Sequence, residues 1–132
     1  MLSIIGSYVY ILGGFDGYEC LREVERIDLS LATPTFEKLK NISTPIKNGA
    51  SYYHAKDGCI YLVGGWDEKE TLDTIFKYDS KTQETHFVSH LPHRIEGHSL
   101  NVIGESMFIF GGFDSFGVTD TIIQVDTNTW ES

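Results

Sequence analysis

The sequence predicts an all-β fold built from three copies of one four-stranded unit. Three observations predict it. A motif in which an apolar run ends in two glycines occurs three times. The runs around it are short and rich in aromatic and β-branched residues, which favours strands over helices. Glycine is abundant at 13 residues whereas proline is rare at 3, so the glycines separate strands rather than form a flexible linker.

The motif recurs with a period of about fifty residues. It reads YVYILGGFD at 8–16, IYLVGGWD at 60–67 and MFIFGGFD at 107–114. The second glycines are Gly14, Gly65 and Gly112, which gives steps of 51 and 47 residues. An apolar residue and an aspartate follow each pair thirteen residues later, and a bulky aromatic follows these. The pairs are Ile27-Asp28, Tyr78-Asp79 and Val125-Asp126, and the aromatics are Phe36, Phe87 and Trp130.

Each copy divides into expected strands in the same order. The glycine-ended strand is expected at 8–12, 59–63 and 107–110, and a second strand at 24–29, 74–79 and 121–126. Another strand, at 50–55 and 98–103, joins the glycine-ended strand through a turn at Asp57-Gly58 or Gly104-Glu105. A further strand is expected at 35–39 and 85–89, and residues 1–5 are expected to be only the tail of a strand. The unit is therefore an antiparallel meander.

The second strand of each copy is apolar on both faces. Val24, Ile75 and Ile122 are expected on one side, and the apolar residues before the aspartates on the other. A sheet that is apolar on both faces must be covered on both, and four-stranded repeats packed face to face are typical of propeller blades. The chain length corresponds to about 2.7 units. We therefore predict an incomplete β-propeller of about 2.7 four-stranded antiparallel blades, with blades at 1–40, 41–90 and 91–132.

The repeats resemble the Kelch family over essentially the whole chain. The resemblance rests on the apolar runs into Gly-Gly, the residues before the aspartates, and the aromatics beyond. Gly-Gly-Phe-Asp-Gly at 13–17 is most similar to animal Kelch-like adaptor proteins. Only Tyr78 keeps the family's tyrosine and only Trp130 its tryptophan. The resemblance implies a ring of more blades, supplied by a longer parent chain in cis or by a second copy in trans. A stable open arc is the third alternative.

Composition excludes several partners. With 10 basic and 19 acidic side chains the formal charge is -9, which opposes binding to nucleic acid or to an anionic membrane surface. Cys20 and Cys59 stand in no metal-binding or redox spacing, and we expect both to be reduced. The apolar start lacks the cationic flank of a secretory signal. We therefore expect a cytoplasmic protein.

The search for catalytic and cofactor motifs gives none. The histidines at 86, 90, 93 and 98 match no zinc spacing, and Pro92 breaks any helix that would align them. The double glycines precede no helix that could hold a phosphate. Asp16, Asp67 and Asp114 are interpreted as turn formers that bond the backbone through their side chains. We expect no enzyme activity, no metal and no cofactor in this chain.

Binding is expected where the copies differ, in the loops after the double glycines. The loop tips offer Tyr18, Phe116, and Glu68 and Glu70 of an acidic triplet, and exposed aromatics suit a protein interface. By the resemblance, residues 40–48 and 90–96 reach the same rim, where Lys47, His93 and Arg94 would contact a peptide carboxylate. The alternative is that Lys47 and Arg94, interpreted as one repeated position, tie neighbouring blades through a buried acidic partner.

These observations lead to one functional hypothesis and two alternatives. The hypothesis is a non-enzymatic protein-interaction module with protein partners on the loop rim, in the substrate-recognition part of a cullin-RING ubiquitin ligase adaptor. The adaptor role comes from the family resemblance alone. The alternatives are a fragment of a sugar-active or copper oxidase Kelch enzyme and an actin-binding scaffold.

Overall fold

The computed structural model describes all 132 residues, and every regular element in it is a β-strand. The strands are β1 (Leu2–Ile5), β2 (Tyr8–Leu12), β3 (Val24–Asp28), β4 (Phe36–Leu39), β5 (Ala50–His54), β6 (Cys59–Val63), β7 (Thr74–Asp79), β8 (Thr85–His90), β9 (Ser99–Ile103), β10 (Ser106–Phe110), β11 (Phe113–Asp114), β12 (Gly117–Val118) and β13 (Ile122–Asp126). The structure thus has no helical segment that could span a bilayer.

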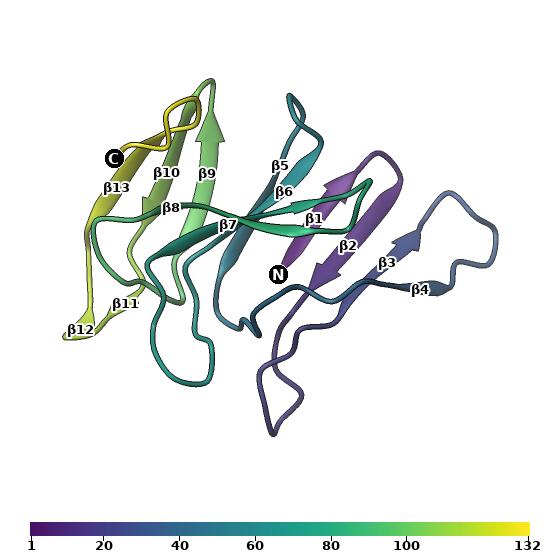
Figure 1. Cartoon of the computed structure of the whole chain (residues 1–132), viewed down its shortest axis with the longest axis horizontal. Coiled ribbons are helices and arrows are strands. Elements are labelled where there is room, and N and C mark those ends of the chain that lie inside the picture. The colour runs from purple at the N-terminus through teal and green to yellow at the C-terminus, as the bar shows by residue number, and fades with distance from the viewer.

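The strands form three main sheets that follow one another along the chain. The first sheet has the order β1-β2-β3-β4, the second β5-β6-β7-β8 and the third β13-β10-β9, and all their neighbouring strands are antiparallel. The sheets lie side by side like blades of a fan, from the purple N-terminal sheet to the yellow C-terminal one (Figure 1). The predicted all-β architecture of partial propeller blades is confirmed. In addition, β11 and β12 form a separate small hairpin.

Two apolar cores lie between the three sheets. The alternation of β6 shows how one strand serves both, because all five of its residues are buried. Tyr61 and Val63 belong to the core shared with the third sheet, whereas Ile60 and Leu62 belong to the core shared with the first. The middle sheet is therefore covered on both faces, as its apolar pattern predicts.

The outer sheets are covered on one face only. Val24 and Ile75 are buried at 1% and 0% exposure, but Ile122, at the same repeat position, is 64% exposed. This face of the third sheet packs on no other sheet in the structure. On the opposite side of the stack, Leu2 and Ile4 of β1 are 64% and 67% exposed.

The double glycines of the first two copies let the glycine-ended strand closely approach the segment that leads to the following sheet. Gly64 has a φ of +61°, and a Cβ on it would lie 2.6 Å from the carbonyl oxygen of Ile95. The next residue, Gly65, donates its backbone N–H to that carbonyl at 2.9 Å. Gly14 bonds the carbonyl of Ile46 in the same way at 2.8 Å. The backbone of the connecting segment thus lies against these glycines, and no larger residue fits there without strain.

Candidate functional site

The loops after the double glycines share one turn geometry. In each loop an aspartate Oδ1 accepts hydrogen bonds from two backbone N–H groups, two and three residues further along the chain. The acceptors and donors are Asp16 with Tyr18 and Glu19, Asp67 with Lys69 and Glu70, and Asp114 with Phe116 and Gly117, at distances of 2.7 to 3.1 Å. The interpretation of these aspartates as turn formers is confirmed.

The segments that connect successive sheets reach the same rim as these loops. Lys47 and Trp66 exchange backbone hydrogen bonds at 3.0 and 2.8 Å, and Glu96 and Phe113 do so at 3.0 and 2.8 Å. Each connecting segment is therefore paired with the loop of the following sheet. The two kinds of loop form one continuous surface, which we call the rim.

This pairing corrects the assignment of Lys47 and Arg94 to one repeated position. The residue equivalent to Lys47 is Glu96, because both pair with the residue after a double glycine. Arg94 instead stands one residue before Ile95, as Pro45 stands before Ile46. The lysine and the arginine thus occupy different positions, with different partners.

Neither cation has a buried acidic partner. The Nζ atom of Lys47 lies 4.2 Å from the centre of the Phe15 ring, a cation–π contact between the first two sheets. The guanidinium of Arg94 donates to the carbonyl oxygen of Thr71 at 2.9 Å and forms an ion pair with Glu70. Both side chains of this ion pair are about half exposed, so Arg94 remains accessible to a ligand.

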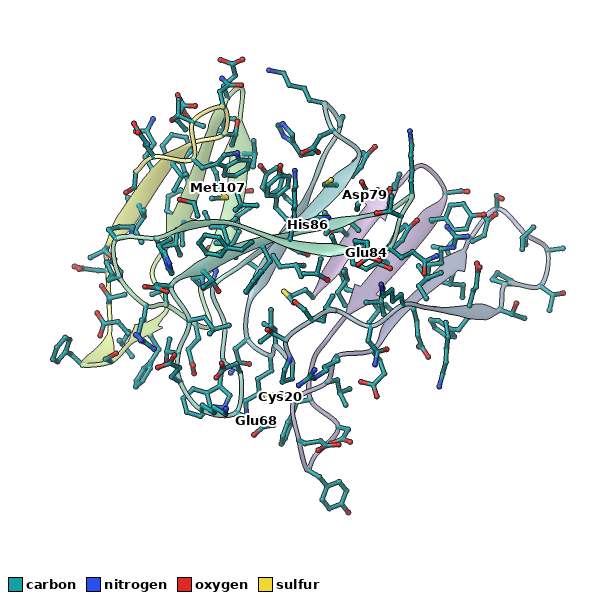
Figure 2. The ribbon with its side chains drawn as sticks, in the orientation of Figure 1. Cys20, Glu68, Asp79, Glu84, His86 and Met107 are labelled. Atoms are coloured by element: carbon teal, nitrogen blue, oxygen red, sulfur yellow. The ribbon has the colours of Figure 1, made fainter.

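Glu68 links two loops through a hydrogen bond, and we call this link the latch. Its carboxylate accepts a hydrogen bond from the backbone N–H of Cys20, and the two residues lie together at the bottom of the molecule in Figure 2. This bond holds the pKa of Glu68 below its ordinary value. Glu68 has a φ of +82°, whereas the first loop has Gly17 at the same repeat position. A non-glycine residue in the left-handed region carries strain, which the latch offsets.

Two aromatic tips project from the rim without partners. Tyr18 is 92% exposed and Phe116 is fully exposed. Phe116 stands in the turn of the β11–β12 hairpin, where Val118 is 89% exposed as well. Of the predicted site residues, these two aromatics are the ones that the structure leaves free.

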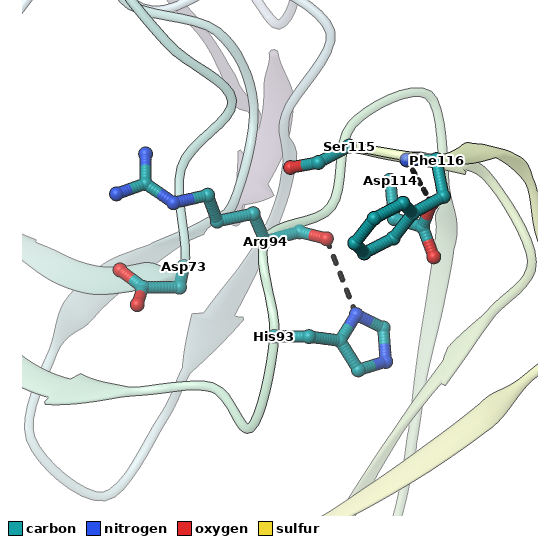
Figure 3. Close-up of a pocket in the computed structure, with 6 residues that line it drawn as sticks. All are labelled: Asp73, His93, Arg94, Asp114, Ser115 and Phe116. Carbon is teal, nitrogen blue, oxygen red and sulfur yellow. Dashed lines mark hydrogen bonds between the residues drawn. The ribbon is translucent and has the colours of Figure 1, made fainter.

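A shallow depression of about 280 Å³ lies beside Phe116, between the second and third sheets. Figure 3 shows its lining side chains, with Phe116 and His93 on one side and Arg94 extending toward Asp73 on the other. His93 Nδ1 lies 3.2 Å from the carbonyl oxygen of Arg94. The lining residues are Asp73, His93, Arg94, Asp114, Ser115 and Phe116.

The depression brings together three of the predicted residues and leaves out the other four. His93, Arg94 and Phe116 line it. Lys47 instead contacts Phe15 in the first loop, and Tyr18 projects freely from that loop. The sequence analysis missed Asp73 and Ser115. Asp73 also lies 3.0 Å from Nδ1 of His90. Its repeat position is Arg22 in the first copy and Asp120 in the third, and this difference between the copies could have identified it as a candidate binding residue.

The histidines do not gather into a ligand set. His98 is 8% exposed, and neither of its ring nitrogens has a hydrogen-bond partner. Burial lowers its pKa. No three His, Cys, Asp or Glu side chains lie close enough together to hold a metal ion. Both cysteines are free and buried.

Comparison with known proteins agrees with this architecture. The Kelch motif model matches residues 2–41 and 54–86. Kelch domain-containing protein 3 of Homo sapiens is 28% identical over 143 residues, which cover 95% of this chain and 37% of that protein. Kelch domain-containing protein 10 of Homo sapiens is 27% identical, over 98% of this chain and 32% of that protein. The chain thus spans about a third of the length of these relatives. It belongs to the Kelch-repeat family.

Proposed function

We propose that this chain is a non-enzymatic protein-interaction module whose partner binds on the rim. The Kelch repeats and the Kelch domain-containing relatives support an interaction module. The observation that carries the rim assignment is the exposure of Tyr18 and Phe116, which have no packing partner in the chain. Rigid aromatic side chains of this kind contribute strongly to protein interfaces because they bury a large area at a small entropic cost.

The contacts within the rim divide the candidate residues into two roles. Tyr18 and Phe116 are the proposed apolar anchors, and His93 and Arg94 are the polar groups that the depression offers to a partner. A carboxylate of the partner would exchange with Glu70 on the guanidinium of Arg94, whose planar donors suit carboxylates.

Lys47, Glu68 and Glu70 have the supporting role in this proposal. Lys47 and Glu68 each contact a residue of the first loop, and Glu70 orients Arg94. They act on binding through the loop positions rather than through direct contact with the partner.

We further propose that the complete protein is a substrate-recognition subunit of a cullin-RING ubiquitin ligase and that it acts in the cytoplasm. The adaptor proposal is supported by the similarity of residues 13–17 to Kelch-like adaptor proteins. The location is supported by two cysteines that remain free and buried. Both proposals concern the protein as a whole.

Quantitative pull-down from cytoplasmic extract tests the rim proposal. The immobilised chain is compared with a double variant, Tyr18→Ser with Phe116→Ser, and with Phe87→Ser as the control. Phe87 is also an exposed aromatic, at 53%, but it lies on β8 away from the rim loops. We expect specific proteins that the wild type and the control retain and the double variant loses.

The result that would overturn the rim proposal is the same set of proteins with all three baits, or no stable partner at all. The adaptor proposal has a separate readout. The same experiment with the full-length parent protein must recover cullin and RING subunits, and their absence would remove the ligase role while leaving the rim interface intact.

A further inference from the structure

The outer faces of the first and third sheets lack the cover that their repeat equivalents have. We call the face of a sheet that packs on the next sheet its following face, and the opposite one its preceding face. The open following face belongs to the third sheet, and its apolar residues are Ile103, Phe108, Phe110 and Ile122. The open preceding face belongs to the first sheet, and its apolar residues are Leu2, Ile4, Val9, Ile11, Ile27 and Phe36.

The second sheet shows what the open following face is shaped to contact. Phe108 and Ile122 stand 47 residues after Tyr61 and Ile75. Tyr61 and Ile75 are 3% and 0% exposed, and both belong to the core formed with the third sheet. The same positions in the third sheet carry side chains of similar size and apolarity, but Ile122 is 64% exposed. The third sheet therefore lacks the preceding face of another sheet to pack on.

The open preceding face has the reciprocal property. Val9 and Ile11 stand 51 residues before Ile60 and Leu62, which are 0% and 1% exposed in the core between the first two sheets. Their neighbours Leu2 and Ile4 on β1 extend the same apolar face. What is missing on this side is a following face.

Charge does not oppose burial of these faces. The two charged residues of the open preceding face, Glu25 and Lys38, are cross-strand partners and neutralise each other. Although the chain carries a formal charge of -9, this face is neutral. The open following face has one charged residue, Asp126, at the end of β13.

We propose that a second copy of this chain covers both faces, head to tail. The following face of one copy's third sheet packs on the preceding face of the other copy's first sheet, and the reciprocal contact closes a ring with twofold symmetry. Both existing joints of the chain combine a following with a preceding face, so a second copy presents to each open face the surface that it fits. Two copies of about 2.7 blades also fall within the range of about 4–8 blades in which propellers close. The proposal concerns assembly of the ring and is independent of partner binding on the rim.

The first test is the solution mass of the full chain by light scattering coupled to size exclusion. We expect twice the chain mass of 14.9 kDa. Ile122→Asp and Ile4→Asp, each at a side chain that is at least 64% exposed, are expected to reduce the mass to that of one copy. Phe116→Asp, the same kind of change on the rim, keeps the double mass. Circular dichroism establishes that each variant retains its strands.

A mixing experiment identifies the head-to-tail arrangement. When the Ile122→Asp and Ile4→Asp variants are mixed, one joint in each pair combines two unaltered faces, so the mass of two copies returns although each variant alone is a single copy. A face that packs on its own equivalent would not be restored by mixing, and this result would overturn the arrangement. A wild-type mass of 14.9 kDa at all concentrations, or masses above two copies, would overturn the closed pair. A mass of one copy would indicate that other blades of a longer chain cover these faces.

Discussion

The carboxylate of Glu68 accepts a hydrogen bond from the backbone N–H of Cys20, 48 residues earlier, and thereby joins the loops of two sheets. Cys20 is 6% exposed, and its thiol lies 3.7 Å from the carbonyl oxygen of Trp66. Burial, and then Glu68, raise the pKa of this thiol to about 11. At neutral pH it is therefore protonated as well as shielded, and both conditions suppress its reactivity.

Replacement of Glu68 is expected to release this thiol. In Glu68→Ala the contact between the loops is lost, so Cys20 should react severalfold faster with iodoacetamide, measured by mass spectrometry of the labelled peptides. Cys59, at 3% exposure in the other core, is the internal control and should keep its rate. Equal rates for Cys20 in both proteins would show that Glu68 does not hold the two loops together. Acceleration at both cysteines would indicate global unfolding.

A methyl group on Gly64 should be far more costly than one on Gly104. Both residues have positive φ, +61° and +60°, and alanine in that region costs about 1–2 kcal/mol in either place. Only at Gly64 would the new Cβ meet backbone, 2.6 Å from the carbonyl oxygen of Ile95, whereas nothing lies within 4 Å at Gly104. Urea unfolding should therefore give losses of more than about 3 kcal/mol for Gly64→Ala and about 1–2 kcal/mol for Gly104→Ala. Similar losses would mean that the close approach contributes nothing.

The strands were predictable because their determinants are local and repeated. Each glycine-ended strand is determined by an apolar run and the turn after it, and the predicted bounds of 8–12 and 59–63 agree with β2 and β6. The predicted second strand at 74–79 likewise agrees with β7. The turns at Asp16, Asp67 and Asp114 follow from the same local chemistry, since an aspartate can bond the backbone two and three residues ahead.

The rim contacts were less predictable because they depend on how unlike segments align. The steps between copies are 51 and 47 residues, so the sequence does not show where the length difference lies. This ambiguity led to the wrong pairing of Lys47 with Arg94. The repeat also does not predict where the bulky aromatics lie. Phe36 and Phe87 are exposed on outer strands, whereas Trp130 follows the turn at 127–129.

Trp130 is expected to stabilise the joint between the second and third sheets. Its ring stacks on Tyr61 with 4.4 Å between ring centres. Trp130 is partly buried against this core. Removal of such an aromatic costs a few kcal/mol, so Trp130→Ala should lower the free energy of unfolding by about 2–3 kcal/mol. Phe87→Ala, at an exposed aromatic, should cost less than about 1 kcal/mol. Equal effects in chemical denaturation would contradict a specific role for the stack.

The buried His98 should make the protein less stable in mild acid. Its pKa is lowered in the folded state, chiefly by burial, so the unfolded chain binds the proton more readily. The stability that depends on the neutral ring is complete above the unfolded pKa of about 6.5 and is lost as the pH falls below it. The loss is limited to about 1.4 kcal/mol per pH unit. Urea unfolding at pH 7.5 and 5.5 should show this dependence in the wild type, and His98→Gln should reduce it by up to that amount. The same pH dependence in both proteins would show that protonation of His98 is not linked to folding.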